Sequence, residues 1–183
     1  MRIDSQIGRL TRLITELLDL SRIEESKLEL QMESFNLCDL VNEVAEDVHF
    51  SSPKYHIIVS GEKQVLVLAD RDRIGQVIIN FITNAIKYSP SNNTIEVQVQ
   101  KVSESNVSVN VKDYGIGIDK QDQEKIFERF YRVEGKSEQR FGGFGIGLYV
   151  AAEIIKRHGG SVSVESEKGK GSIFSFILPF VTE

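Results

Sequence analysis

The chain has 183 residues, of which 40% are hydrophobic and 27% charged, as in a globular protein with one core plus an appendage. Its net charge of -5 argues against a nucleic-acid-binding protein. The single cysteine, Cys38, rules out an internal disulfide, and no apolar run approaches the roughly 20 residues that cross a bilayer.

The first predicted element is a helix over residues 2–26. Its apolar residues recur at steps of four and three, as in the seam of a coiled coil: Ile3, Ile7, Leu10, Ile14 and Leu17. Such a pattern also suits an amphipathic helix packed on its own domain. The width of the seam favours a partner helix.

The next stretch predicts a strand, a helix and then a pair of strands. Residues 28–35 alternate as a strand does, and Asn36 is placed to cap a helix over 37–48. Residues 56–60 and 64–69 are interpreted as two strands paired around the turn Gly61-Glu62. Asp70 or Asp72 then caps the following helix.

That helix, predicted over 72–88, carries an unusual polar face. Asn80, Asn84 and Lys87 share one side at spacings of four and three residues, and Tyr88 follows. An Asn oxygen is a Mg²⁺ ligand, and Lys neutralises phosphate charge. The face therefore suits a Mg²⁺–phosphate site, although a polar helix face alone is more often simply solvated.

Two glycine clusters follow a predicted hairpin of strands over 94–102 and 106–112, which delivers Asp113. The first cluster holds Gly115 and Gly117. The second, Gly142-Gly143-Phe144-Gly145-Ile146-Gly147, opens a helix over 148–157, where free N–H groups favour an anion. Neither cluster matches a P-loop or a Rossmann fingerprint. Strands over 161–166 and 171–179 end a pattern that by itself supports only an α+β fold.

Four motifs, in order and at the family's spacing, resemble those of sensor histidine kinases. Asn80-Phe-Ile-Thr-Asn84-Ala-Ile-Lys87-Tyr88-Ser resembles the asparagine box, and Asp113-Tyr-Gly115-Ile-Gly117 the first glycine box. Phe127-Glu-Arg-Phe130-Tyr-Arg132 is similar to the phenylalanine box, and Gly143-Phe-Gly145-Ile-Gly147-Leu148 to the second glycine box. The resemblance covers nearly the whole chain.

The resemblance implies a two-layer α/β sandwich of the Bergerat fold, with a mixed sheet of about five strands and three helices on one face. Residues 1–27 would be the second helix of a dimerisation hairpin, and 28–183 the catalytic ATP-binding domain, with an ATP lid at about 114–144. We expect the first hairpin helix, which carries the phosphoacceptor histidine, to be missing from the chain.

The resemblance also implies a role for each site residue. Asp113 would accept a hydrogen bond from the adenine amine, and Gly115 and Gly117 would let the backbone approach the base. Asn84 would hold Mg²⁺, with Asn80 as a possible second ligand. The remaining expected ATP contacts are Lys87, Tyr88, Arg132, Lys136, Gly143, Gly145, Gly147 and Leu148. Arg140 is a weaker candidate, and solvated side chains are nearly as good an interpretation of Lys136 and Arg140.

Two positions depart from the family, and no histidine fits the acceptor position. Phe144 stands where a small or hydroxyl residue is usual, which removes a side-chain contact to phosphate. Asn80 replaces the glutamate base of related ATPases and cannot accept a proton, so we expect slow hydrolysis. His49, His56 and His158 lack the acidic residue that follows an acceptor, and all three are interpreted as structural or surface residues. His158 is placed at a helix end, where a cationic side chain would suit the helix dipole. We therefore assign no catalytic residue within the chain.

The function implied is transfer of the ATP γ-phosphoryl group to a histidine outside this chain, with ATP and Mg²⁺ as cofactors. The implied partners are the dimerisation hairpin, a response-regulator receiver domain and, in the parent protein, a second copy, with no nucleic acid. The expected location is the cytoplasm, and the parent sensor could itself be anchored in the membrane. Two alternatives stay open: a stand-alone serine kinase of the anti-sigma type, and a non-enzymatic, nucleotide-gated binding module.

Overall fold

The computed structural model describes residues 11, 14–15, 17–23, 25, 28–133 and 144–180. A five-stranded mixed sheet has the order β2-β4-β5-β7-β6, and a separate two-stranded sheet pairs β1 with β3. The elements are β1 (Met32–Asn36), α2 (Leu37–Ser51), β2 (His56–Gly61), β3 (Leu66–Asp70), α3 (Arg71–Tyr88), β4 (Thr94–Lys101), β5 (Asn106–Asp113), η1 (Lys125–Phe127), α4 (Gly147–Arg157), β6 (Ser161–Glu167) and β7 (Gly171–Pro179). The predicted α+β class is confirmed.

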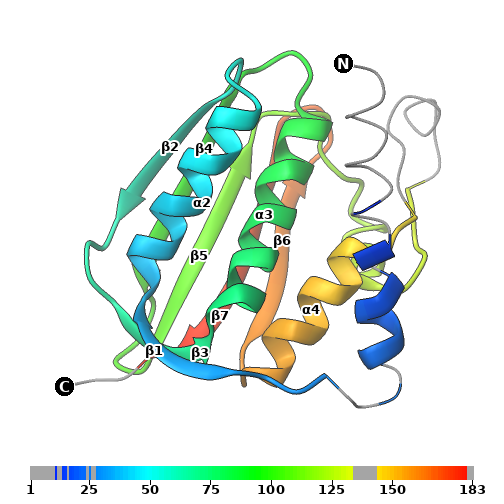
Figure 1. The fold of residues 1–183 in the computed structure, drawn as a ribbon. Helices are drawn as coiled ribbons and strands as arrows, with labels where there is room; N and C mark the ends of the chain where they lie inside the picture. Colours follow the sequence, from blue (N-terminus) through cyan, green and yellow to red (C-terminus); the bar gives the residue numbers. More distant parts are fainter. Residues whose placement is uncertain are drawn as a thin grey trace.

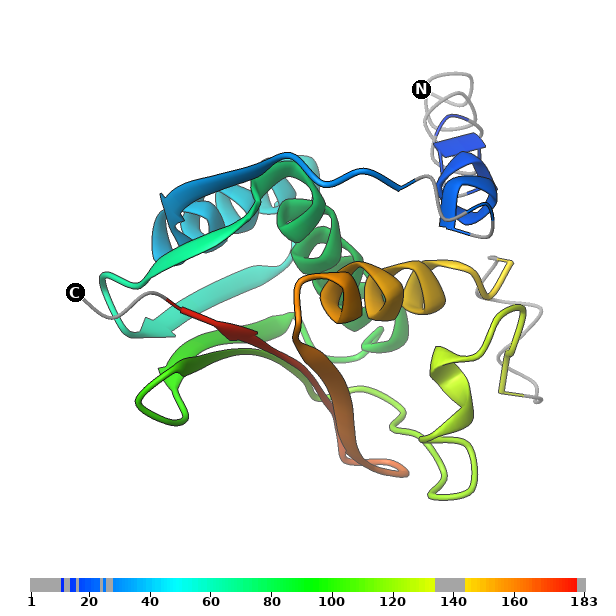
Figure 2. The ribbon, with the colours of Figure 1, turned by 90° about the horizontal axis from the view of Figure 1, so that it is seen from below.

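Helices α2, α3 and α4 cover one face of the sheet, which gives the predicted two layers (Figures 1 and 2). The core lies between them because the central strands alternate. Val107, Val109 and Val111 of β5 point inward and are fully buried. On β7, Phe174 and Phe176 do the same and pack against Phe81 of α3, with ring centroids 5.6 and 6.1 Å from the Phe81 ring. Burial of these side chains is the main force that fixes α3 over the sheet.

The predicted pairing of residues 56–60 with 64–69 is wrong. Strand β2 pairs in parallel with β4, and β3 pairs antiparallel with β1. At Gly61, with φ of 102°, the chain leaves the sheet edge instead of reversing into a hairpin. Asn36 then fixes the new partner, because its side-chain oxygen accepts a hydrogen bond from the Val65 N–H at 2.9 Å.

Side-chain caps define where α2 and α3 begin. Asn36 caps α2, as predicted, by accepting a hydrogen bond from the Cys38 N–H. Of the two candidates for α3, Asp70 is the cap: one oxygen accepts from the Arg73 N–H and the other from the Gln31 N–H. Each cap contributes about 1 kcal/mol and also ties its helix to another segment.

His158 is a buried structural residue rather than a cation at the end of α4. Its Nε2 accepts a hydrogen bond from the Asp70 N–H at 3.0 Å, which leaves the proton on Nδ1, 2.7 Å from the Ile154 carbonyl oxygen. The ring is therefore the neutral tautomer and joins α4 to the start of α3, which agrees with a structural role and does not use a charge at the helix end.

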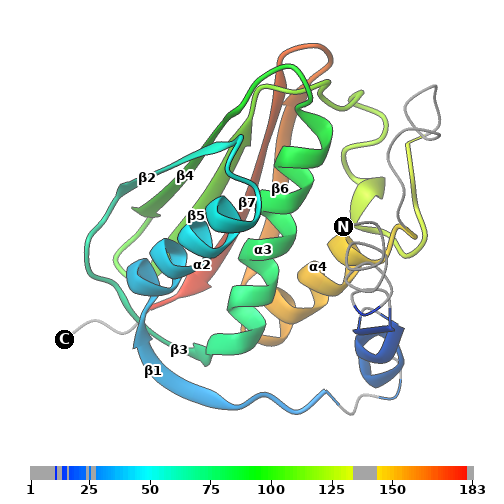
Figure 3. The same ribbon diagram turned by 45° about the horizontal axis from the view of Figure 1, so that its top comes forward.

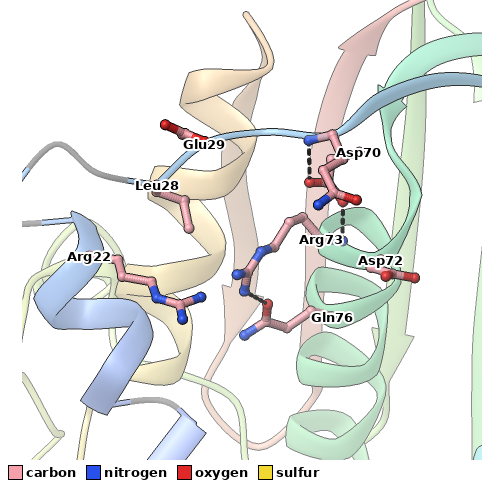
Figure 4. A pocket seen from close by; sticks show the side chains of 8 residues that line it. Arg22, Leu28, Glu29, Asp70, Asp72, Arg73 and Gln76 are labelled. Carbon is pink, nitrogen blue, oxygen red and sulfur yellow. Dashed lines mark hydrogen bonds between the residues drawn. The ribbon is translucent and has the colours of Figure 1, made fainter.

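The described N-terminal residues 17–23 are helical and contact the ends of α3 and α4. Buried Asp19 accepts hydrogen bonds from Arg73 and Gln76, both at 2.7 Å. A cavity of about 450 Å³ at this junction is lined by Arg22, Leu28, Glu29, Gln31, Asp70, Asp72, Arg73 and Gln76 (Figure 4). Among the described residues, no helix has both the length and the apolar character needed to cross a membrane.

Candidate nucleotide-binding site

Asp113 ends β5 on the core-facing side of the sheet and is 3% exposed. Its carboxylate accepts hydrogen bonds from the Gly115 N–H, at 2.7 Å, and from the Ser172 N–H of the neighbouring strand. Burial raises the pKa of the Asp113 carboxyl group, and the two backbone donors partly oppose that increase. The result is a fixed, poorly solvated acceptor, the kind of group that selects a ligand by a single hydrogen bond.

The loop after Asp113 fits tightly between α3 and the β6–β7 turn, and glycine is what allows it. A Cβ at Gly115 would lie 2.1 Å from the Tyr88 carbonyl oxygen, and one at Gly117 would lie 2.0 Å from the Glu167 carbonyl oxygen. Gly117 also has φ of 65°, in the left-handed region. The first glycine motif therefore lets this loop lie against two backbones while keeping Asp113 at its start.

Asn80 and Asn84 meet on one face of α3, as their spacing predicts. The Asn84 side-chain N–H donates to the Asn80 oxygen at 3.0 Å, so the Asn84 oxygen points away from Asn80. Asn80 is 8% exposed and fills the space beside Gly147, where a Cβ would lie 2.3 Å from the Asn80 Nδ2. Because Gly147 has no side chain, Asn80 can pack directly against the N-terminus of α4.

Lys87 and Tyr88 are the last two residues of α3, about one turn after Asn84. The Lys87 Nζ lies 4.7 Å from the centroid of the Tyr88 ring, and the Tyr88 carbonyl oxygen accepts a hydrogen bond from the Ile116 N–H at 3.1 Å. Tyr88 therefore contacts the glycine loop through its backbone. Both side chains are partly buried.

The segment 118–133 runs beside the start of α4 (Figure 3). Apolar side chains anchor this segment: Ile126 is buried, and the Phe127 ring packs edge-on against Phe174 with centroids 6.4 Å apart. Phe130, with φ of 63°, donates its N–H to the Gly145 carbonyl oxygen at 3.0 Å. A Cβ at Gly145 would lie 2.6 Å from the Tyr131 carbonyl oxygen, so residues from the middle of the predicted lid contact the chain just after the end of the lid.

Of the other predicted contacts, some lie within the described residues and some lie outside them. Arg132 and Leu148 are partly buried, and Leu148 packs against the core. Lys136, Arg140 and Gly143 lie outside the described residues. Within the described chain, no cluster of three or more His, Cys, Asp or Glu side chains could hold a metal ion. A cation here would have to share the Asn oxygens with phosphate oxygens of a ligand.

Sequence reasoning missed Ser166 and Ser172. These residues lie opposite each other on β6 and β7, with hydroxyl oxygens 2.9 Å apart, and Ser172 lies opposite Asp113 on β5. A signal was available. Both serines continue the core-facing alternation of their strands, after Val162 and Val164 and before Phe174. A polar residue at a core-facing position near a predicted site indicates a side chain that hydrogen-bonds within that site.

Comparison with known proteins gives one family. Residues 69–182 match the family described as histidine kinase-, DNA gyrase B-, and HSP90-like ATPase. The sensor histidine kinase WalK of Bacillus subtilis (strain 168) is 32% identical over 182 residues, which are 98% of this chain and 30% of that protein. The chain thus spans about a third of this curated relative.

Solved structures share the fold of this chain. Full-length ShkA in complex with AMPPNP superposes with a TM-score of 0.81 and 26% identity, over 96% of this chain and 36% of that one. The histidine kinase ThkA in complex with the response regulator protein TrrA gives a TM-score of 0.74 and 29% identity, over 96% of this chain and 49% of that one.

Proposed function

Because the chain belongs to the family of histidine kinase-, DNA gyrase B-, and HSP90-like ATPases, we propose that it is the catalytic, ATP-binding part of a sensor histidine kinase. In this proposal it transfers the γ-phosphoryl group of ATP to a histidine outside the chain. The observation that carries it is Asp113, a buried carboxylate held by two backbone N–H groups at the mouth of a glycine-lined loop.

The base site follows from the chemistry of that carboxylate. Ionised Asp113 accepts hydrogen bonds and cannot donate them, so it favours a ring that presents an amine, as adenine does. Guanine presents a carbonyl oxygen at that place, which would leave the buried carboxylate unpaired. Gly115 and Gly117 keep the adjoining backbone close enough to line the base.

The phosphate end is supported by α3 and α4. The Asn84 oxygen, turned away from Asn80, is the proposed Mg²⁺ ligand, and Asn80 orients it. Lys87 supplies positive charge, and the N-terminus of α4 at Gly147 offers free N–H groups to phosphate oxygens. Arg132, Lys136 and Gly143 remain proposed contacts. Bound Mg²⁺ would neutralise charge on the transferred phosphoryl group, so the chain's own task is positioning.

The partners are part of the same proposal. ThkA is described in complex with a response regulator, and we propose that the parent of this chain likewise passes its phosphoryl group to a receiver-domain aspartate. Residues 1–27 are proposed as part of a dimerisation hairpin, with a homodimeric, cytoplasmic kinase region.

The test is phosphotransfer from radiolabelled Mg-ATP to a separately produced acceptor hairpin of a sensor kinase. We expect acid-labile, base-stable label on the acceptor's histidine, and none with Asp113→Asn. A hairpin whose acceptor histidine is replaced by Gln is the matched control. Acid-stable label on serine supports the anti-sigma type of kinase instead. Nucleotide binding without any transfer supports the binding module and contradicts the kinase.

A further inference from the structure

A row of polar residues closes the core-facing side of the sheet at its nucleotide end. The row consists of Ser166, Ser172 and Asp113, which lie opposite one another on β6, β7 and β5. The next two rows inward are apolar, formed by Val164, Phe174 and Val111 and then by Val162, Phe176 and Val109. The change from apolar to polar side chains therefore occurs at one level across three strands.

Ser166 is the member of this polar row that reaches the glycine loop. Its hydroxyl oxygen accepts a hydrogen bond from the Ile118 N–H at 2.8 Å. The same hydroxyl donates to the Gly171 carbonyl oxygen at 2.8 Å and lies 2.9 Å from the Ser172 hydroxyl oxygen. Since its one proton goes to Gly171, the Ser172 hydroxyl is the donor in their contact. One side chain thus joins the loop to both strands of the β6–β7 hairpin.

Gln123 and Gly169 add three further hydrogen bonds to this attachment, and we call the whole set, with those of Ser166, the clasp. The Gln123 side-chain N–H groups donate to the Ser166 carbonyl oxygen at 2.7 Å and to the Ile118 carbonyl oxygen at 3.1 Å. The Gly169 N–H donates to the Ile116 carbonyl oxygen at 2.7 Å. On its other side the loop is held through the backbone, by the hydrogen bond from the Ile116 N–H to the Tyr88 carbonyl oxygen. Without Ser166, the Ile118 N–H loses its partner in a part-buried place.

We propose that Ser166 is a positioning residue of the nucleotide site, holding the loop at Ile116–Ile118 where Gly115 and Gly117 can line the base beside Asp113. It acts through the loop and does not touch the ligand. This inference rests on the proposed ATP-binding function and assigns a new residue to that site.

Replacing Ser166 should weaken the contacts to the base of the nucleotide and leave the contacts to its phosphates unchanged. Loss of one hydrogen bond to the loop, with an N–H left unpaired, weakens nucleotide binding about 5- to 30-fold. The loss is equal for ADP and for a non-hydrolysable ATP analogue, because the loop lies at the base and not at the γ-phosphate. Thr at this position keeps a hydroxyl and restores binding.

The experiment is calorimetric titration of both nucleotides into the wild type, Ser166→Ala, Ser166→Thr and Ser163→Ala. Ser163 is the matched control, an exposed serine on the opposite side of the same strand. Amide exchange at Ile118 in the nucleotide-free protein is the second readout and should quicken only in Ser166→Ala. A purely structural role would lower stability without changing the affinity of the folded fraction.

The outcomes are distinct. A wild type that binds neither nucleotide overturns the proposed function, and this inference with it. A wild type that binds while Ser166→Ala binds equally well overturns only the role of Ser166. If Ser166→Ala does not fold, Gln123→Ala removes the other side-chain contact of the clasp. Several-fold weaker binding by that variant supports the inference, and unchanged binding contradicts it.

Discussion

At the scale of single residues, Asp113 is a carboxyl group that folding makes harder to ionise. Its pKa is raised chiefly by burial, against the opposing effect of the Gly115 and Ser172 N–H groups. A folded-state pKa above the unfolded one means that the folded protein binds the proton more tightly. Stability from this group is therefore present at low pH and is lost as pH rises through the folded pKa.

Asp113→Asn tests that reasoning, because Asn keeps the shape and the acceptor oxygen but not the charge. We expect the free energy of unfolding of the wild type, relative to Asp113→Asn, to fall as pH rises from about 4 to 7. Urea unfolding of both proteins across this range measures it, and contributions from other groups cancel in the difference. A difference that grows with pH would contradict the raised pKa.

At the scale of elements, the site depends on the contact between α3 and the start of α4. Asn80 occupies the space that a side chain at Gly147 would need. Gly147→Ala should therefore displace Asn80, and Asn84 with it, and weaken Mg-nucleotide binding about tenfold, the equivalent of one lost polar contact. Calorimetric titration measures the change.

Gly75→Ala is the matched control for that substitution. Gly75 lies within α3, and a Cβ there would meet Leu40 at 3.5 Å, an ordinary contact. This variant should bind nucleotide normally and gain about 0.5–1 kcal/mol of stability, because Ala favours the helix. Equal affinity for Gly147→Ala and the wild type would show that Asn80 does not need its observed place.

The elements themselves were largely predictable, and so were the hairpins β4–β5 and β6–β7, but the partners of β2 and β3 were not. Asn36 and the residues of α3 carry local signals, a cap and a helical apolar face, so the sequence places these helices within a few residues. The partner of β3 depends on Asn36 reaching Val65, a contact across 29 positions that no local pattern contains. The same holds for Ser166, whose importance comes from the distant Ile118.

At the scale of the whole molecule, one end of a single two-layer fold gathers the candidate site. The polar row of Ser166, Ser172 and Asp113 lies at the sheet end. Asn80 and Asn84 contact each other on α3, and Asn80 lies beside Gly147, which opens α4. The motifs indicated these residues by resemblance to a family. The fold explains the arrangement, since β5 and α3 finish and β7 begins at this end, while α4 begins beside the middle of α3 at Asn80 (Figure 3).

The most direct test of this account is calorimetric titration of a non-hydrolysable ATP analogue, with and without Mg²⁺, into the wild type, Asp113→Asn and Asn84→Ala. We predict micromolar-range binding by the wild type that strengthens with Mg²⁺. Asp113→Asn should lose binding in both conditions, and Asn84→Ala should lose only the strengthening by Mg²⁺. No binding by a folded wild type, or undiminished binding by Asp113→Asn, would contradict the central claim that Asp113 reads the base of a bound adenine nucleotide.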